Sequence, residues 1–316
     1  MNIIFAGTPK FAADHLKLLI DSQHKIKCIL TQPDRGSGRG KKVKPSPVKE
    51  IGLDNGIEVL QPTSLKDEST IRSLESMKPD LMLVVAYGLL IPKEVLDIAE
   101  KGCVNVHASI LPRWRGAAPM EYSIYSGDNE SGISYMRMNE GLDEGPILEI
   151  HKCKIEEEDD LGTLESKFVE LSKKNLLNFL KKFEKGELKE TPQEDSKATF
   201  APKINSDFQK IDWSCVSSEI ERKIRALNPK YGAFTFLGNK RVKIYKSSPA
   251  KSTSKLGPGK IEISEDGKLK VGCSQETAII IDTVQMEGKS IVQSEEFVRG
   301  YRSLIIQEDK FSSNVQ

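Results

Sequence analysis

The sequence predicts an α/β protein in which a doubly wound, Rossmann-like domain is followed by a small OB-type β-barrel domain. In the first half of the chain, short apolar runs alternate with helical patterns, which is typical of βαβ units. One run, Leu81–Ala86, is apolar throughout, as expected for a central parallel strand covered on both faces. Near the C-terminus the pattern changes to short strands separated by Gly-containing turns, which favours a small barrel.

The elements of the first domain follow from these patterns in chain order. Asn2–Phe5 reads as a strand, Phe11–Ile20 as a helix and Ile26–Leu30 as the next strand. Leu81–Ala86 and Cys103–Val106 are the later strands. In doubly wound sheets, ligands bind beyond the carboxyl ends of the strands, so the residues that follow these runs are candidates for a site.

The second half gives the domain boundaries. Leu161–Phe183 is a long amphipathic pattern that closes the first domain, and the segment after it is polar with little periodicity. We therefore expect a first domain over residues 1–184, a linker over 185–206 and a second domain over 207–316. The second domain begins with a helical pattern at Val216–Leu227. Its predicted strands are Ala233–Leu237, Val242–Tyr245, Lys260–Ile263, Leu269–Val271 and Ala278–Val284.

Composition excludes several classes of protein. The chain has 316 residues with 38% hydrophobic residues, which is enough for two domains with their own cores. No apolar run approaches the roughly 18 residues of a spanning helix, and the N-terminus lacks a signal-peptide pattern, so we expect a cytoplasmic protein without a membrane partner. The five cysteines contain no CxxC pair and only four histidines accompany them, so we expect neither a disulfide framework nor a metal site.

The charges are segregated although the net charge is only +1. Residues 222–260 contain 11 Lys and Arg and no acidic residue, and Asp34–Lys49 carries six basic residues and one acid. Such faces bind polyanions, which favours a nucleic-acid contact. The glycines of the second stretch fit neither a Walker A loop nor GxGxxG, and suit an arm that orders against RNA.

The segment 102–119 holds the candidate chemistry. Asn105 and His107 are two residues apart at the end of a strand, so both point the same way. An amide and an imidazole side by side can donate two hydrogen bonds to one developing oxyanion. Asp143, in a turn-rich loop, is the candidate carboxylate that orients the histidine. From spacing alone, purely structural roles for all three residues remain open.

At these residues the sequence resembles the methionyl-tRNA formyltransferase family, within the wider group of enzymes that use 10-formyltetrahydrofolate. The shared signature, Asn-x-His-x-Ser-x-Leu-Pro followed by Leu-Asp-x-Gly, is present at 105–112 and 142–145. Further matches extend the resemblance over nearly the whole chain; they are 5–9, 32–41, 112–119, 211–213 and 224–229. The chain departs from the family at Glu121-Tyr122, where Gln-Arg is common, and at Glu144 and Pro146.

The resemblance implies formyl transfer from 10-formyltetrahydrofolate to the α-amino group of methionine on initiator tRNA. Asn105 and a protonated His107 would stabilise the oxyanion, and Asp143 would favour the charged imidazole and order a proton-carrying water. The folate would lie against Ser109, Ile110, Leu111 and Pro112. The tRNA would contact Arg39, Lys41 and Lys42 of the arm, and Arg222, Lys223 and Lys243 of the basic stretch. The family also implies a monomer.

Other functions are weighed by features that the sequence contains or lacks. A formyltransferase for a small amine, such as a purine precursor or an amino sugar nucleotide, would leave the basic arm and the basic stretch without a purpose. A folate- or RNA-binding protein without catalysis would be favoured if Asn105, His107 or Asp143 were absent, and none is. A dehydrogenase is disfavoured because no GxGxxG follows the first strand. For Trp114, stacking on a base and anchoring its loop both remain open.

Overall fold

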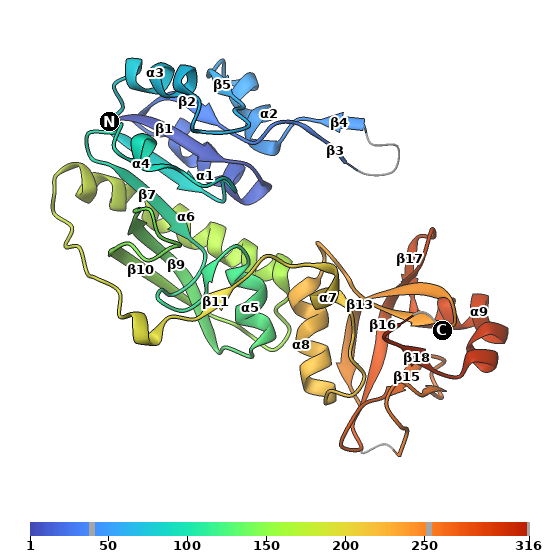
Figure 1. Cartoon of the computed structure of the whole chain (residues 1–316). Helices are drawn as coiled ribbons and strands as arrows, with labels where there is room; N and C mark the ends of the chain where they lie inside the picture. The colour runs from blue at the N-terminus through green and yellow to red at the C-terminus, as the bar shows by residue number, and fades with distance from the viewer. Residues whose placement is uncertain (38–41, 251–254, 315–316) are drawn as a thin grey trace. The chain divides into compact units, whose positions relative to one another are not determined.

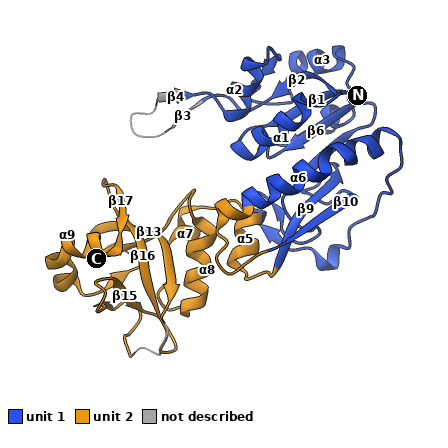
Figure 2. Ribbon diagram, turned by 180° about the vertical axis from the view of Figure 1, so that it is seen from behind, with its two compact units in different colours: residues 1–119, 130–154, 165–201 blue, residues 120–129, 155–164, 202–316 orange. Residues whose placement is uncertain are grey.

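The computed structural model describes residues 1–37, 42–250 and 255–314 (Figure 1). The chain forms two compact units (Figure 2). Unit 1 contains residues 1–119, 130–154 and 165–201, and unit 2 contains 120–129, 155–164 and 202–316. Two short segments from the first part of the chain, 120–129 and 155–164, therefore belong to unit 2, whereas the sequence placed a single linker over 185–206. Residues 185–201 of that segment belong to unit 1.

Unit 1 is built on one seven-stranded sheet with the order β10-β9-β7-β6-β1-β2-β5. The five strands from β7 to β5 run parallel, and β9 and β10 add an antiparallel edge. Its strands are β1 Asn2–Gly7, β2 Lys25–Leu30, β5 Val59–Leu60, β6 Leu81–Val85, β7 Cys103–His107, β9 Glu130–Arg137 and β10 Ile147–Lys154. This confirms the predicted α/β sheet. The edge strands β9 and β10 were not expected from the sequence.

Burial explains the central strands. All five residues of β6 are buried, as the apolar run predicts. On one face, Ile4 and Met82 share an apolar cluster with Leu74 and Val95. The helices of this part of the chain are α1 Lys10–Ile20, α2 Pro47–Asp54, α3 Glu68–Ser76, α4 Lys93–Leu96, α5 Pro119–Tyr125, α6 Leu161–Glu184 and the 3-10 helix Asp195–Lys197.

Two small strand pairs of unit 1 lie outside the main sheet. β3 Arg35–Ser37 and β4 Lys42–Lys44 form an antiparallel pair within the predicted arm. β8 Arg115–Gly116 pairs in parallel with β11 Phe200–Ala201. The second pair brings the segment that the sequence identified as a linker back to the end of the signature segment 102–119.

Unit 2 contains an antiparallel barrel with the order β14-β15-β16-β13-β12-β18, and β17 pairs with β16. The two ends of this order meet: the Ile261 amide donates to the Asp309 carbonyl at 2.9 Å, and the Phe311 amide to the Gly259 carbonyl at 2.8 Å. The predicted small barrel is therefore confirmed. Its elements are α7 Ser206–Gln209, α8 Ser217–Leu227, β12 Ala233–Leu237, β13 Lys240–Pro249, β14 Ile261–Ile263, β15 Leu269–Gly272, β16 Ala278–Met286, β17 Ile291–Gln293, α9 Ser294–Glu308 and β18 Phe311–Ser312.

Within the described ranges, no helix has the length and apolar character needed to cross a bilayer. The same ranges hold no group of three His, Cys, Asp or Glu side chains suited to a metal ion. All five cysteines are free.

Candidate active site

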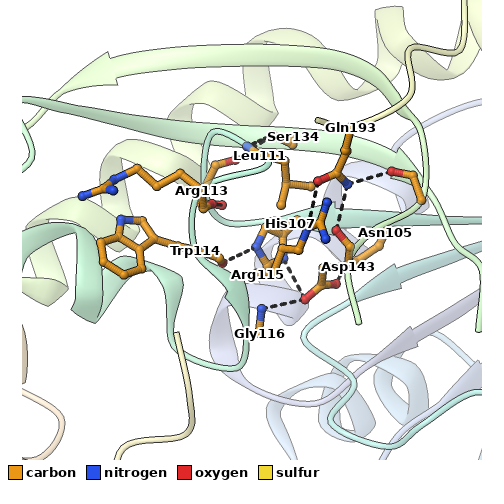
Figure 3. A network of polar contacts seen from close by, with 12 residues as sticks. Asn105, His107, Leu111, Arg113, Trp114, Arg115, Gly116, Ser134, Asp143 and Gln193 are labelled. Atoms are coloured by element: carbon orange, nitrogen blue, oxygen red, sulfur yellow. Dashed lines mark hydrogen bonds and ion pairs between the residues drawn. The ribbon is translucent and has the colours of Figure 1, made fainter. Parts of the chain in front are cut away.

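The structure brings Asn105, His107 and Asp143 together at the carboxyl end of β7 (Figure 3). The Asn105 amide donates to Oδ1 of Asp143 at 3.1 Å. Oδ2 of the same carboxylate accepts the main-chain N–H of Gly116 at 2.9 Å and lies 3.6 Å from Nδ1 of His107. Asp143 therefore contacts both Asn105 and His107 of β7. The contact with His107 is the one that the sequence predicted.

The other ring nitrogen of His107 also has a partner. Its Nε2 lies 2.9 Å from the main-chain carbonyl of Trp114. A carbonyl only accepts, so Nε2 carries the hydrogen. The ring is 5% exposed and is thus held between a carboxylate and a carbonyl. An oxyanion that accepts a hydrogen bond from Nε2 would have to replace the Trp114 carbonyl, a condition that the sequence did not reveal.

The loop that carries Asp143 has an unusual backbone. Asp143 adopts φ 51°, a left-handed conformation that costs about 1–3 kcal/mol for a residue with a side chain. Two residues later, a Cβ on Gly145 would lie 1.9 Å from the main-chain oxygen of Arg137, so the loop needs a glycine there. Gly116 is required for a similar reason: its φ is 119°, and a Cβ would lie 2.7 Å from the Ala201 carbonyl.

A glutamine and an arginine support this loop. The Gln193 amide nitrogen donates to the carbonyls of Asp143 and Gly145, at 2.8 and 2.7 Å. Its oxygen accepts from Nε of Arg115 at 3.0 Å, and Arg115 also donates to Asp195 at 2.8 Å. Sequence reasoning missed these residues, because Gln193 and Asp195 lie in a polar segment without periodicity.

The four residues expected to contact folate differ in exposure. Ser109 and Leu111 are buried, with exposures of 0% and 3%, whereas Ile110 and Pro112 are half-buried. The Ser109 hydroxyl donates to the Arg113 carbonyl at 2.6 Å. The Leu111 amide donates to the Ser134 hydroxyl, which in turn donates to the Ser109 carbonyl. The run is therefore held by hydrogen bonds with Arg113 and with Ser134 of β9.

Trp114 is buried shortly after this run. Its side chain is 9% exposed, the Arg113 guanidinium lies 4.3 Å from the centroid of its ring, and its amide donates to the Thr199 hydroxyl at 3.0 Å. These contacts favour the anchoring role over stacking on a base.

A cavity of about 510 Å³ adjoins the Asp143 loop. Loop residues 139–141 and 144 form one wall, and Leu96, Cys103 and Met138 add apolar surface. This volume lies in the range of small-molecule sites. None of residues 109–112 is among the described residues that line it.

The candidate tRNA contacts fall into two groups. Arg39 and Lys41 lie outside the described residues, and Lys42 begins β4. In unit 2, Arg222 donates to the Tyr125 carbonyl at 3.0 Å, Lys223 to the Lys210 carbonyl at 3.2 Å and Lys243 to the Tyr231 carbonyl at 2.6 Å. Burial lowers the pKa of both lysines.

The exposed lysines of the basic stretch lie elsewhere. Two exposed lysines, Lys230 and Lys260, pair with Glu121 and Asp309. Lys240 and Lys246 of β13, together with Lys255, are exposed as well. Because surface charge binds phosphate best where water already reaches it, these residues are better placed for polyanion contact than the three that the sequence singled out.

The departure at Glu121-Tyr122 is accommodated inside unit 2. Glu121 is 4% exposed, and its Oε1 accepts the Tyr231 hydroxyl at 3.2 Å. The Tyr122 ring lies 5.1 Å from that of Phe208. Both side chains therefore pack within the same unit as the barrel.

Comparison with known proteins identifies the family of the chain. The formyl transferase family matches residues 1–180, and the formyl transferase C-terminal domain matches residues 203–302. A methionyl-tRNA formyltransferase of Marinobacter nauticus is 42% identical over 306 residues, which cover 97% of this chain and 98% of that protein. One from Pseudoalteromonas translucida is 43% identical over 302 residues, which cover 95% and 94% of the two chains.

A solved structure of similar fold is WlaRD, a sugar 3N-formyl transferase crystallised in the presence of dTDP and 5-N-formyl-THF. The match has a TM-score of 0.66 at 20% identity and covers 92% of this chain and 99% of that one. At this identity the likeness concerns the fold, whereas the relatives above match in sequence from end to end. The chain accordingly belongs to the methionyl-tRNA formyltransferase family.

Proposed function

We propose that the chain transfers the formyl group of 10-formyltetrahydrofolate to the α-amino group of methionine on initiator methionyl-tRNA, giving the formylated tRNA used to start translation. The observation that carries the proposal is the meeting of Asn105 and His107 on the carboxylate of Asp143 at the end of β7. The family of the chain supports the same reaction.

Asn105 supplies one donor to the formyl oxygen, on which negative charge develops as the amine attacks. Its amide has two hydrogens, and the bond to Asp143 uses one of them. The carboxylate thus orients the amide while its second hydrogen serves the oxygen. Such a donor contributes about 2.7–4 kcal/mol to transition-state stabilisation.

His107 supplies the second donor after an exchange of partners. Its Nε2–H leaves the Trp114 carbonyl for the formyl oxygen, while Asp143 faces Nδ1 and stabilises the positive ring.

Asp143 also directs the proton. The attacking nitrogen must lose a proton and the leaving N10 must gain one as its bond to the formyl carbon breaks. A water held by the carboxylate carries the proton between them, so that no covalent bond to the enzyme forms.

The folate is held in the cavity beside the Asp143 loop, whose volume of about 510 Å³ suits a pterin. From the run 109–112, Ile110 and Pro112 contribute contacts, because Ser109 and Leu111 are buried.

The tRNA is bound by the arm and by the basic stretch of unit 2. Arg39, Lys41 and Lys42 of the arm contact the acceptor stem. Phosphate contacts come from the exposed Lys240 and Lys246, while Arg222, Lys223 and Lys243 support this surface through their main-chain bonds. A stretch of chain without acidic residues suits this task.

The test mixes the purified chain with 10-formyltetrahydrofolate and methionine-charged initiator tRNA, and detects formyl-methionine by mass after deacylation. Charged elongator methionine tRNA is the parallel control. We expect formylation of the initiator alone. If neither tRNA is formylated although the chain binds folate, the proposal is wrong, and small amines become the acceptors to screen.

A further inference from the structure

Gln193 makes three hydrogen bonds, two with main-chain carbonyls of the Asp143 loop and one with Arg115 of β8 (Figure 3). Its amide nitrogen donates to the carbonyls of Asp143 and Gly145, at 2.8 and 2.7 Å, and its oxygen accepts from Arg115 at 3.0 Å. Both hydrogens of its amide nitrogen therefore bind main-chain carbonyls of one loop, which lies 48 to 50 residues earlier in the chain.

The loop depends on such a donor. Asp143 has a left-handed backbone, and the carbonyls on either side of Glu144 point to the same place, where one NH₂ group reaches both. A side chain without two donor hydrogens at one atom could not satisfy both carbonyls in this geometry. Arg115, which is 4% exposed, fixes the glutamine and is fixed in turn by Asp195.

The same loop sets the carboxylate in place. Oδ1 and Oδ2 of Asp143 accept from Asn105 and from the Gly116 amide and face His107. A small rotation of the loop backbone would move the carboxylate away from all three partners, because they are held by β7 and β8, not by the loop.

We propose that Gln193 is a positioning residue for formyl transfer: it holds the main chain of the Asp143 loop so that the carboxylate keeps its contacts with Asn105 and His107. This inference rests on the proposed function. It assigns a role in the reaction to the segment that the sequence identified as a linker.

The first variant is Gln193→Glu. Glutamate keeps the size of the side chain and an acceptor for Arg115, and replaces the donor group by an oxygen that faces two carbonyls. We expect kcat to fall about 10- to 100-fold, as for the loss of one or two hydrogen bonds, with KM for methionyl-tRNA changed less than about threefold. The matched control is Asn175→Asp on α6, whose amide donates to the Leu171 carbonyl at 2.8 Å, and it should leave kcat unchanged.

A double-mutant cycle separates positioning from a general effect on the fold. In the Asp143→Asn background, Gln193→Glu should lower kcat by less than about threefold, because the group through which it acts is already altered. The pH dependence of kcat should also shift in Gln193→Glu and stay unchanged in Asn175→Asp. If Gln193→Glu does not fold, Gln193→Met, which has similar length and no donor, enters the same cycle.

The outcomes are distinct. If the unmodified chain formylates initiator methionyl-tRNA and the folded Gln193 variants keep kcat within threefold, the inference is wrong and the proposed function stands. The inference is also wrong if the reductions in kcat caused by the Gln193 substitution and by Asp143→Asn multiply fully in the double variant. An unmodified chain without formylation would overturn the proposed function, and this inference with it.

Discussion

At the scale of single residues, the carboxylate of Asp143 is the centre of the site because both of its oxygens accept hydrogen bonds, one from a residue of β7 and one from a residue of β8. Oδ1 accepts from Asn105, and Oδ2 accepts from the Gly116 amide and faces His107. If Asp143 were asparagine, its NH₂ group would face either the Asn105 amide or the Gly116 N–H, which are themselves donors. The contacts with Asn105 and Gly116 could then not both form.

The first prediction concerns these three side chains. Asn105→Ala, His107→Ala and Asp143→Asn should each lower the rate of formyl transfer by about 10² to 10³ while the chain stays folded. Single-turnover kinetics with charged initiator tRNA measure the rate, and circular dichroism checks the fold. Near-normal activity in His107→Ala would contradict the mechanism.

The second prediction uses the glycine that donates to Asp143. Gly116→Ala places a Cβ 2.7 Å from the Ala201 carbonyl at φ 119°, which forces the main chain to move. The movement lengthens the hydrogen bond from the main-chain N–H of residue 116 to the Asp143 carboxylate. Loss of a hydrogen bond to a charged group costs about 1.5–3 kcal/mol, so kcat should fall about 10- to 100-fold.

Gly186→Ala is the matched control for that substitution. Gly186 also has a positive φ, 70°, but an added Cβ would meet nothing within 4 Å. Its replacement should cost stability, on the order of 1 kcal/mol, and leave kcat unchanged. Equal kinetic losses in both alanine variants would show that the contact with Asp143 does not matter.

At the scale of elements, α1 and α6 are joined by a buried histidine. Nδ1 of His15 lies 2.7 Å from the Phe11 carbonyl, and Nε2 lies 2.6 Å from the Ser172 hydroxyl. Because a carbonyl only accepts, the neutral ring donates through Nδ1 and accepts through Nε2. Desolvation by burial lowers the pKa of His15 from 6.5 to about 4, in spite of the carbonyl.

The third prediction is the pH dependence that follows. The unfolded chain binds the proton near pH 6.5 and the folded chain only near pH 4, so acid favours the unfolded state between these values. The free energy of unfolding should therefore fall by about 3 kcal/mol from this residue as the pH drops through that window. Urea titrations from pH 7 to 4 measure it, and His15→Gln should show a smaller fall than the parent chain.

The arm is held at its base by a second cluster. Nζ of Lys49 lies 2.6 Å from Oδ2 of Asp34 and from Oε1 of Gln61, and the Gln61 amide donates to Oδ1 of Asp34 at 2.8 Å. Hydrogen bonds from Lys49 and Gln61 lower the pKa of Asp34. The cluster fastens the chain just before β3 to the beginning of α2.

The fourth prediction tests what the cluster does for tRNA. Lys49→Met should raise KM for methionyl-tRNA several-fold and leave KM for the folate unchanged. Without the contacts of Lys49, the base of the arm is less well preorganised for binding tRNA. Arg39→Ala should also raise KM for methionyl-tRNA. Lys10→Met, which removes an exposed ion pair with Asp14 on α1, is the control. Equal losses for both substrates would contradict an arm that serves tRNA.

At the scale of the whole molecule, the basic stretch gives the chain a face for polyanions although the net charge is only +1. Of its residues, Lys240 and Lys246 are exposed, whereas Arg222, Lys223 and Lys243 bond to main-chain carbonyls. Binding to a polyanion releases counterions in proportion to the phosphates that are contacted.

The fifth prediction is the salt dependence of tRNA binding. With roughly six phosphate contacts, affinity should fall about 10³-fold between 50 and 200 mM salt. The double variant Lys240→Gln, Lys246→Gln should reduce the slope of log affinity against log salt by about two. Lys17→Gln, Lys66→Gln, two exposed lysines of unit 1, should leave it unchanged. A flat salt response of the parent chain would rule out this role.

Much of this protein follows from local pattern alone. The apolar runs predicted β1, β2, β6 and β7 to within a few residues, and the alternating segments after 233 predicted the barrel. Asn105, His107 and Asp143 were identified from residue type and motif, and the structure brings them together. The pattern succeeds here because burial on two faces requires continuous apolar strands, and because side chains two apart on a strand point the same way.

Only the tertiary structure decided the rest. It paired β8 with β11, closed the barrel between residues 259–261 and 309–311, and directed Gln193 at the Asp143 loop and the Trp114 carbonyl at His107. The sequence determined which residues are apolar, basic or chemically competent. It could not determine which distant donor meets which main-chain carbonyl, because a carbonyl has the same chemistry at every residue and its partner depends on the path of the folded chain.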